Sequence, residues 1–287
     1  MDNRLAGGPA ASYWGIVKKT IKERFLVAIV LMGVLFLAIE YFPDLGFFCV
    51  LQILILISLF EFYNLFKGSR NPPYQLLGLL MSLMISASIL FDAVTLEMAL
   101  LSSLFLAAVY PLIFLRRADT LAPFANAVAL TLLGPLFVNL TINHVYLLRL
   151  EKGADYVYFL IIAVICGDSA SYFIGKFWGK HQLAPKASPR KTWEGTFAGF
   201  VFAGLSALFV QQVLIPEILL WKAVVVAVLV NVFAQIGDLL ESLFKRAAGQ
   251  KDSSKILGGH GGFLDRIDSF VLAVPFFYYF LKIFRLN

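Results

Sequence analysis

Nine long apolar segments constrain the fold of this chain more than any other feature. An α-helix that crosses a bilayer needs roughly 20 predominantly apolar residues, because each residue adds about 1.5 Å. Sixty per cent of the 287 residues are hydrophobic and 15% are charged, so the apolar segments are too many for one water-soluble core. The segments cover residues 25–42, 45–66, 75–91, 96–115, 122–142, 155–175, 195–215, 218–240 and 266–284.

These segments predict transmembrane helices rather than the strands of a barrel. Each segment is continuously apolar, whereas a barrel strand alternates apolar and polar residues over about ten positions. We therefore expect an all-α, polytopic membrane protein with about nine transmembrane helices.

The lysine and arginine residues indicate how the helices are oriented. If the N-terminus is cytoplasmic, 19 of these residues fall on the cytoplasmic side and 5 on the outer side. The positive-inside rule therefore favours a cytoplasmic N-terminus and an external C-terminus. Positive-inside loops and anionic lipid headgroups explain the net charge of +6. We find no nucleic-acid-binding motif and expect no nucleic-acid partner.

The chain divides into two unlike parts. Residues 1–150 carry helices joined by short loops, and we expect them to supply packing, lipid or dimer contacts. Glu61 lies near the end of a segment in this part, and we interpret it as an interfacial or snorkelling carboxylate. Residues 151–287 contain two polar loops, 176–194 and 241–265, which would both face the cytoplasm. We expect the chemistry in this second part.

Acidic and amide side chains lie inside the apolar segments of the second part. An ionised Asp at a helix centre costs about 2.5–3.5 kcal/mol on insertion scales, so such residues usually have a partner or a role. We favour a functional role for Asp168 and Asp238, and interhelical hydrogen bonding for Asn231 and Gln235. Asp168 shares one helix face with Tyr172, and this face could bind a sugar, a base or a metal, or form a polar packing seam.

The segment Ser188 to Gly195, SPRKTWEG, suggests an anion site. Pro189 and Thr192 suit the first turn and the cap of the helix that follows. A helix N-terminus with free N–H groups, flanked by Arg190 and Lys191, can bind a phosphate. The alternative is the ordinary positive charge of a cytoplasmic loop.

The densest polar stretch is Ser242 to Asp268, which combines acids, bases and a Gly-rich turn. Asp265 and Asp268 stand at i and i+3 at the start of the last segment, where Asp238 can meet them across the loop. Two or three carboxylates with open positions are the usual way to hold Mg²⁺ in phosphoryl-transfer sites. The glycines around His260 permit a close backbone approach, and their amides could cradle a pyrophosphate. These glycines are Gly258, Gly259, Gly261 and Gly262.

The same stretch carries the pattern S-x-x-K-R-x4-K-D-x-S-x2-L-G-x-H-G-G-x-x-D-R-x-D. It resembles the signature of the phosphatidate cytidylyltransferase (CDP-diacylglycerol synthase) family, with Gly258 where many members have Pro. The upstream blocks D-S-x-x-Y-x-x-G and L-A-P-K-x-S-P-R-K-T-W-E-G are also similar to the family, with Ser171 where Ala is commoner. The resemblance covers roughly residues 155–284.

The resemblance implies a nucleotidyltransferase of phospholipid biosynthesis. CTP and phosphatidic acid would give CDP-diacylglycerol and pyrophosphate, with Mg²⁺ required and a second, monovalent cation such as K⁺ beside it. The protein would be a homodimer in the bacterial inner membrane, with its active site facing the cytoplasm. The attacking phosphate oxygen is already anionic near neutral pH, so positioning and charge neutralisation would suffice without a strong general base.

The resemblance also implies roles for individual residues. The cation site would consist of Asp238, Asp265 and Asp268. Catalysis would further involve Lys251, His260 and Arg266. The nucleotide would be held by Asp168, Tyr172, Ser188, Lys191 and Thr192, and phosphate groups by Lys245, Arg246, Lys251, Gly261 and Gly262.

Two alternatives stay open at this point. A CTP-dependent lipid kinase acting on a polyprenol or phytol would use the same nucleotide but release CDP rather than pyrophosphate. A transporter would place its intramembrane acids along an ion path, but here the charged groups gather in loops on one side.

Overall fold

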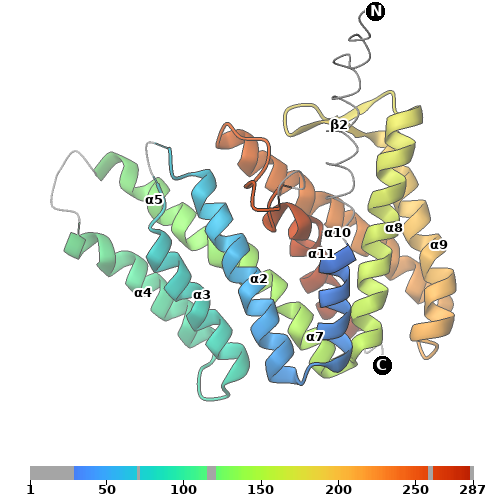
Figure 1. Cartoon of the computed structure of the whole chain (residues 1–287), viewed down its shortest axis with the longest axis horizontal. Coiled ribbons are helices and arrows are strands. Elements are labelled where there is room, and N and C mark those ends of the chain that lie inside the picture. The colour runs from blue at the N-terminus through green and yellow to red at the C-terminus, as the bar shows by residue number, and fades with distance from the viewer. Residues whose placement is uncertain (1–28, 70–71, 115–120, 258–260, 285–287) are drawn as a thin grey trace, which may run out of the picture.

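The computed structural model describes residues 29–69, 72–114, 121–257 and 261–284, and it is almost entirely helical (Figure 1). Each predicted apolar segment corresponds to helical structure, although the predicted ends differ by several residues. The first helix is Ile29–Tyr41. The others are α2 (Asp44–Leu65), α3 (Gln75–Leu90), α4 (Leu96–Phe114), α5 (Leu121–Gly134), α6 (Leu140–Ile142), α7 (His144–Lys152), α8 (Ala154–Trp178), α9 (Trp193–Leu214), α10 (Leu220–Ala247) and α11 (Leu264–Ile283).

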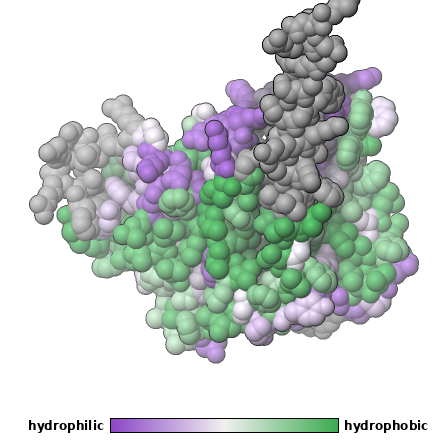
Figure 2. All heavy atoms as spheres, in the orientation of Figure 1, coloured by the Kyte–Doolittle hydropathy of each residue, from purple (hydrophilic) through white to green (hydrophobic). Residues whose placement is uncertain are grey.

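Five of the described helical stretches are long and apolar enough to cross a membrane. Three further apolar helices are shorter: Ile29–Tyr41, Gln75–Leu90 and Leu96–Tyr110. Large apolar side chains cover much of the visible lateral face, and polar ones gather at its upper and lower edges (Figure 2). An apolar outer face with all backbone groups paired inside helices is the arrangement that a bilayer requires, so this is an integral membrane protein. The five stretches are Asp44–Leu65, Phe124–Lys152, Ala154–Trp178, Trp193–Leu214 and Leu220–Ala247.

A π-helical turn, Pro135–Asn139, joins α5 to α6 and makes one nearly continuous stretch to Lys152. Proline has no N–H to donate to the preceding turn, and a wider turn absorbs the missing bond. The predicted segment 122–142 therefore ended too early. The turn also presents Asn139 to α3, where it donates to the Ser82 carbonyl over 2.8 Å and to the Ser86 hydroxyl over 2.9 Å.

Helices α8, α9, α10 and α11 pack closely through glycines. A Cβ at Gly199 on α9 would lie 2.2 Å from the Ser171 hydroxyl oxygen on α8, and one at Gly167 on α8 would lie 2.0 Å from Asn231 on α10. No side chain fits in so short a gap, so these glycines set the helix spacing. The expected interhelical hydrogen bonding is confirmed for Gln235, whose Nε2 donates to the Thr196 carbonyl of α9 over 3.3 Å. It was wrong for Asn231: its Oδ1 accepts from Gln235 of the same helix over 2.8 Å, and its buried Nδ2 has no hydrogen-bond partner among the described residues.

The predicted loop 176–194 is not irregular throughout, because it contains an antiparallel hairpin of β1 (Gln182–Ala184) and β2 (Ser188–Thr192). The predicted cap is confirmed: the Thr192 hydroxyl accepts a hydrogen bond from the Gly195 N–H over 3.2 Å at the start of α9. The placement of Pro189 in the first helical turn was wrong, because Pro189 lies within β2.

The predicted loop 241–265 is shorter than expected. Helix α10 continues to Ala247, so Lys245 and Arg246 occupy its last turn, where positive side chains favour the helix dipole. The remaining connection, residues 248–263, is called the 248–263 loop below. It lies at the same end of the molecule as the β hairpin (Figure 1).

Candidate active site

Acidic and basic side chains from four elements meet at the end of the molecule that carries the hairpin. They come from the second half of α8, from β2, from the last turns of α10 and from the first turns of α11. We call four of the acids the carboxylate cluster: Asp168, Asp238, Glu241 and Asp268.

Lys191 joins the β hairpin to this cluster. Its Nζ lies 2.7 Å from Asp238 Oδ2, and the two side chains are 23% and 29% exposed. Arg246 makes a second connection from α10 to the hairpin, because its Nε donates to the Ala187 carbonyl over 3.3 Å. The hairpin is therefore held against α10 by two cations that the sequence assigned to substrate phosphates.

Asp168 and Asp268 lie on either side of Ser269. The Ser269 hydroxyl donates to Asp168 Oδ2 over 2.8 Å, and the Ser269 N–H donates to Asp268 Oδ1 over 2.7 Å. Asp238 is near enough to interact electrostatically with both carboxylates. Three helices thus bring like charges together, which is unfavourable unless a cation or a basic group lies between them.

Glu241 belongs to the same cluster, although the sequence analysis did not select it. It is fully buried and forms an ion pair with Lys245, while its Oε1 has no hydrogen-bond partner. Helical spacing could have predicted that Glu241 lies beside Asp238, since Asp238, Glu241 and Lys245 stand at i, i+3 and i+7 on one face of α10.

Asp265 is held separately, by donors from α10 and the 248–263 loop. Lys245 Nζ lies 2.7 Å from Oδ1, and Oδ2 accepts from the Ser253 hydroxyl over 2.8 Å and from the Gly262 N–H over 2.7 Å. Burial raises the pKa of Asp265, but these hydrogen bonds and the charge of Lys245 outweigh burial and hold that pKa below its ordinary value. Asp265 and Asp268, which we expected to point the same way, contact different groups.

The glycines of the 248–263 loop are explained by how closely acids approach them. Gly261 has φ of 78°, and a Cβ there would lie 2.4 Å from Asp265 Oδ2. A Cβ at Gly262 would lie 2.4 Å from Glu61 Oε2. The Gly262 amide, which we expected to face a pyrophosphate, here donates to Asp265. Gly258, Gly259 and His260 lie outside the described residues.

The interpretation of Glu61 as an interfacial or snorkelling carboxylate was wrong. Its side chain is 1% exposed, and it accepts hydrogen bonds from the Ser254 hydroxyl over 2.6 Å and from the Leu264 N–H over 2.8 Å. A residue in the first part of the chain therefore contacts the loop that carries the sequence signature.

Four other predicted site residues lie at the edge of this region. Tyr172 is 61% exposed and contacts Phe173 and Lys176. Lys251 and Arg266 are exposed, and Ser188 is half-buried at the start of β2.

The cluster has the chemistry of a divalent-cation site. Carboxylate oxygens are the ligands that Mg²⁺ prefers, four acids gather beside Lys191 and Lys245, and Glu241 has an unused oxygen. However, no three His, Cys, Asp or Glu side chains among the described residues are arranged around one metal position. The residues fit the ion in type and charge, and coordination would require Asp238 to turn away from Lys191.

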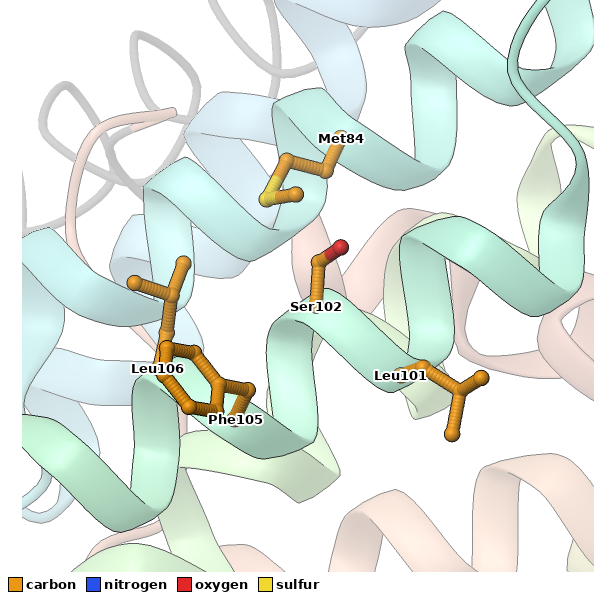
Figure 3. Close-up of a pocket in the computed structure, with 5 residues that line it drawn as sticks. All are labelled: Met84, Leu101, Ser102, Phe105 and Leu106. Atoms are coloured by element: carbon orange, nitrogen blue, oxygen red, sulfur yellow. The ribbon is translucent and has the colours of Figure 1, made fainter.

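One apolar hollow among the described residues lies elsewhere, away from the carboxylate cluster. It measures about 400 Å³ and is lined by Met84, Leu101, Ser102, Phe105 and Leu106 on α3 and α4 (Figure 3). A second hollow of about 260 Å³ lies next to it, between α3, α4 and the π-helical turn. Both are almost wholly apolar, so they offer no groups for phosphate chemistry.

Comparison with known proteins finds relatives over nearly the whole chain. Residues 22–284 match the model of the family described as "Cytidylyltransferase family". A Bacillus subtilis protein named phosphatidate cytidylyltransferase is 33% identical over 275 residues, which cover 92% of this chain and 98% of the relative. Proteins of the same name from Haemophilus influenzae and Staphylococcus epidermidis are 42% identical over 132 residues and 40% identical over 147 residues. These matches cover 45% and 51% of this chain, and 46% and 56% of the relatives.

Proposed function

The chain belongs to the cytidylyltransferase family, and from this premise we propose how it acts as a phosphatidate cytidylyltransferase. It is an integral membrane enzyme that makes CDP-diacylglycerol and pyrophosphate from CTP and phosphatidic acid. The assignment of the site rests on one observation. Carboxylates and lysines from α8, β2, α10 and α11 meet at one end of membrane-spanning helices.

We propose that this site aligns two phosphates for an in-line displacement. A phosphate oxygen of phosphatidic acid attacks the α-phosphorus of CTP, the bond between that phosphorus and the bridging oxygen breaks, and its electron pair leaves on pyrophosphate. The attacking oxygen is already anionic, so no side chain needs to remove a proton. The reaction also needs no activated Ser or Cys nucleophile, which agrees with a site made of Asp, Glu, Lys and Gly.

The lysines have a double role in this proposal. Lys191 pairs with Asp238, and the single charge of Lys245 is shared between Glu241 and Asp265. When CTP arrives, Lys191 turns from Asp238 to a phosphate, which neutralises the nucleotide and frees the carboxylate. Arg246, Lys251, Arg266, His260 and the Gly261–Gly262 amides complete the phosphate contacts, while Asp168, Tyr172, Ser188 and Thr192 line the nucleotide side.

Mg²⁺ would be held by Asp238, Asp265 and Asp268, with Glu241 as a further ligand, and Asp265 would have to exchange Lys245 or Ser253 for the ion. The bound ion would supply charge neutralisation and orientation for the triphosphate. A second, monovalent cation such as K⁺ would offset the remaining negative charge of the cluster. The support for this proposal is the excess of carboxylates over basic groups and the unused oxygen of Glu241.

We also propose the setting in which the enzyme works. Nine apolar helices would span the bacterial inner membrane with the N-terminus in the cytoplasm, and two copies would form a homodimer. CTP would enter from the cytoplasm and phosphatidic acid sideways from the bilayer. The distribution of Lys and Arg supports this orientation, and bacterial relatives support the membrane.

A product assay tests the function. Purified protein in lipid–detergent micelles is incubated with labelled CTP, phosphatidic acid and Mg²⁺, and the lipid and water-soluble products are separated. We expect equal amounts of CDP-diacylglycerol and pyrophosphate, and no turnover in excess EDTA until Mg²⁺ is restored. Release of CDP with a phosphorylated polyprenol or phytol would instead identify a lipid kinase. Activity that is unchanged in EDTA would overturn the Mg²⁺ requirement.

A further inference from the structure

We infer that Glu61 of α2 is a positioning residue that sets the place of Asp265 in the active site. The inference rests on the proposed function, and it concerns a residue outside the sequence signature. Both oxygens of Glu61 contact the stretch of chain that leads into Asp265: Oε1 accepts from the Ser254 hydroxyl over 2.6 Å, and Oε2 accepts from the Leu264 N–H over 2.8 Å.

Glu61 supplies the cap that α11 lacks. Phe263, at the N-cap position of α11, makes no side-chain capping bond, and the Leu264 N–H belongs to the first helical turn, which has no partner within the helix. A carboxylate at this end also favours the helix dipole. Glu61 therefore fixes where α11 begins, one residue before Asp265.

Glu61 also shares a partner with Asp265. The Ser253 hydroxyl lies 2.8 Å from Asp265 Oδ2 and 3.4 Å from Glu61 Oε2, and the Ser253 N–H donates to Asp265 Oδ2 over 3.0 Å. Gly262 lies between the same two acids, because its N–H donates to Asp265 while its Cα stands against Glu61. The two carboxylates thus hold one short stretch of chain from opposite sides.

The chemistry of these contacts favours positioning over simple packing. Burying a carboxylate costs free energy unless hydrogen bonds satisfy it. An apolar side chain would stabilise the contact between α2 and the loop without this desolvation cost. No ion pair accompanies Glu61 among the described residues, and its contacts are the loop donors and the α11 amide. A fixed acceptor of this kind restricts the loop to one arrangement, which an apolar contact would not do.

Hydrogen exchange at single amides, combined with turnover, tests the inference. Glu61→Gln retains the shape of the side chain but loses one acceptor oxygen and the charge. We expect faster exchange at the Ser253 and Gly262 amides, which bind Asp265 and not Glu61, and turnover lower by about 10-fold. Ser58→Ala is the matched control, because Ser58 is buried one turn earlier on α2 and its hydroxyl has no partner. The control should leave both measurements unchanged.

Other outcomes would overturn the inference. Faster exchange at Leu264 alone with normal turnover would mean that Glu61 only caps α11. A uniform rise across α8 and α10 would mean a general loss of stability. If Glu61→Gln does not fold, Ser254→Ala decides, since it removes the 2.6 Å bond from the loop side and should give a smaller effect in the same direction. The exchange result does not depend on activity. Wild-type protein that makes no CDP-lipid would refute the proposed function, and the exchange measurement would still test whether Glu61 positions the loop.

Discussion

The two parts of this molecule bury polar side chains in opposite ways. Before α8, and apart from Glu61, a neutral buried network joins the helices: Gln52 donates to Asn143 over 2.7 Å and accepts from Ser86 over 2.6 Å, and Asn139 bonds both Ser82 and Ser86. From α8 onward, buried neutral side chains such as Gln235 are joined by carboxylates of like charge that lie together, and a buried oxygen of Glu241 has no partner. A network of paired neutral groups stabilises the helices, whereas a charged network with an unpaired oxygen indicates a candidate ligand site.

The two parts are nevertheless not independent. Helix α11 packs against α2, α6 and α7 as well as against α8 and α10, and Glu61 reaches from α2 to the 248–263 loop. We therefore propose that the first part contributes to the site by holding its loop rather than by binding substrate. The following predictions test this difference, beginning with the largest expected effect.

Asp265→Asn should reduce turnover by about 100-fold or more, because it removes the charge that pairs with Lys245 and would hold the cation. Turnover is measured as CDP-lipid formed per molecule of purified enzyme. Expression and membrane insertion should stay normal, since the replacement has the same shape. Asp155→Asn, at the exposed start of α8, is the control and should have no effect. Near-normal turnover in Asp265→Asn would exclude the cation role.

Lys191→Met should reduce turnover by about 10- to 100-fold, since the strand would lose the cation that we assign to the nucleotide. The half-saturating CTP concentration should rise as well. Lys180→Met is the matched control, because Lys180 lies just before β1 and its side chain is exposed. A variant of Lys191 with unchanged CTP dependence would show that the 2.7 Å ion pair with Asp238 only holds the hairpin.

The sequence was sufficient to predict the helices and the region of the site, for physical reasons. A transmembrane helix needs a long apolar run, and this signal is local, so every predicted segment corresponds to a helix. The cap at Thr192 was also a local signal. The hairpin was missed because β1 has only three residues, and short strands have no distinctive pattern. The end of α10 was missed because charged residues in its last turn resemble a loop.

The contacts between distant residues could not be predicted in this way. Glu61 and Leu264 are 203 positions apart, and nothing in the sequence near Glu61 indicates a partner on α11. The separation of Asp265 from Asp268 depends on where Lys245 and Ser253 lie in three dimensions. Helical spacing showed that the two acids could share a face, but it could not show which donors each one meets.

Gln52→Leu should destabilise the protein by about 1–2 kcal/mol, since it removes two interhelical hydrogen bonds within a membrane-buried network. The measurement is the unfolding free energy in detergent. Turnover per folded molecule should stay normal, because the network does not contact the 248–263 loop in the described structure. Loss of turnover with normal stability would contradict the structural role that we assign to the first part.

Lys152→Ala should have the smallest effect, with turnover within about 2-fold of wild type. Lys152 ends α7 at the end of the molecule opposite to the hairpin. Asp168 lies about 21 Å along α8, because the 14 steps from Ala154 each add about 1.5 Å. An interaction over that distance across a bilayer would need a conformational change rather than a contact. A strong loss of turnover in this variant, with normal stability, would place substrate-binding groups at both ends of the helices. It would thereby refute the orientation on which the proposed cytoplasmic site depends.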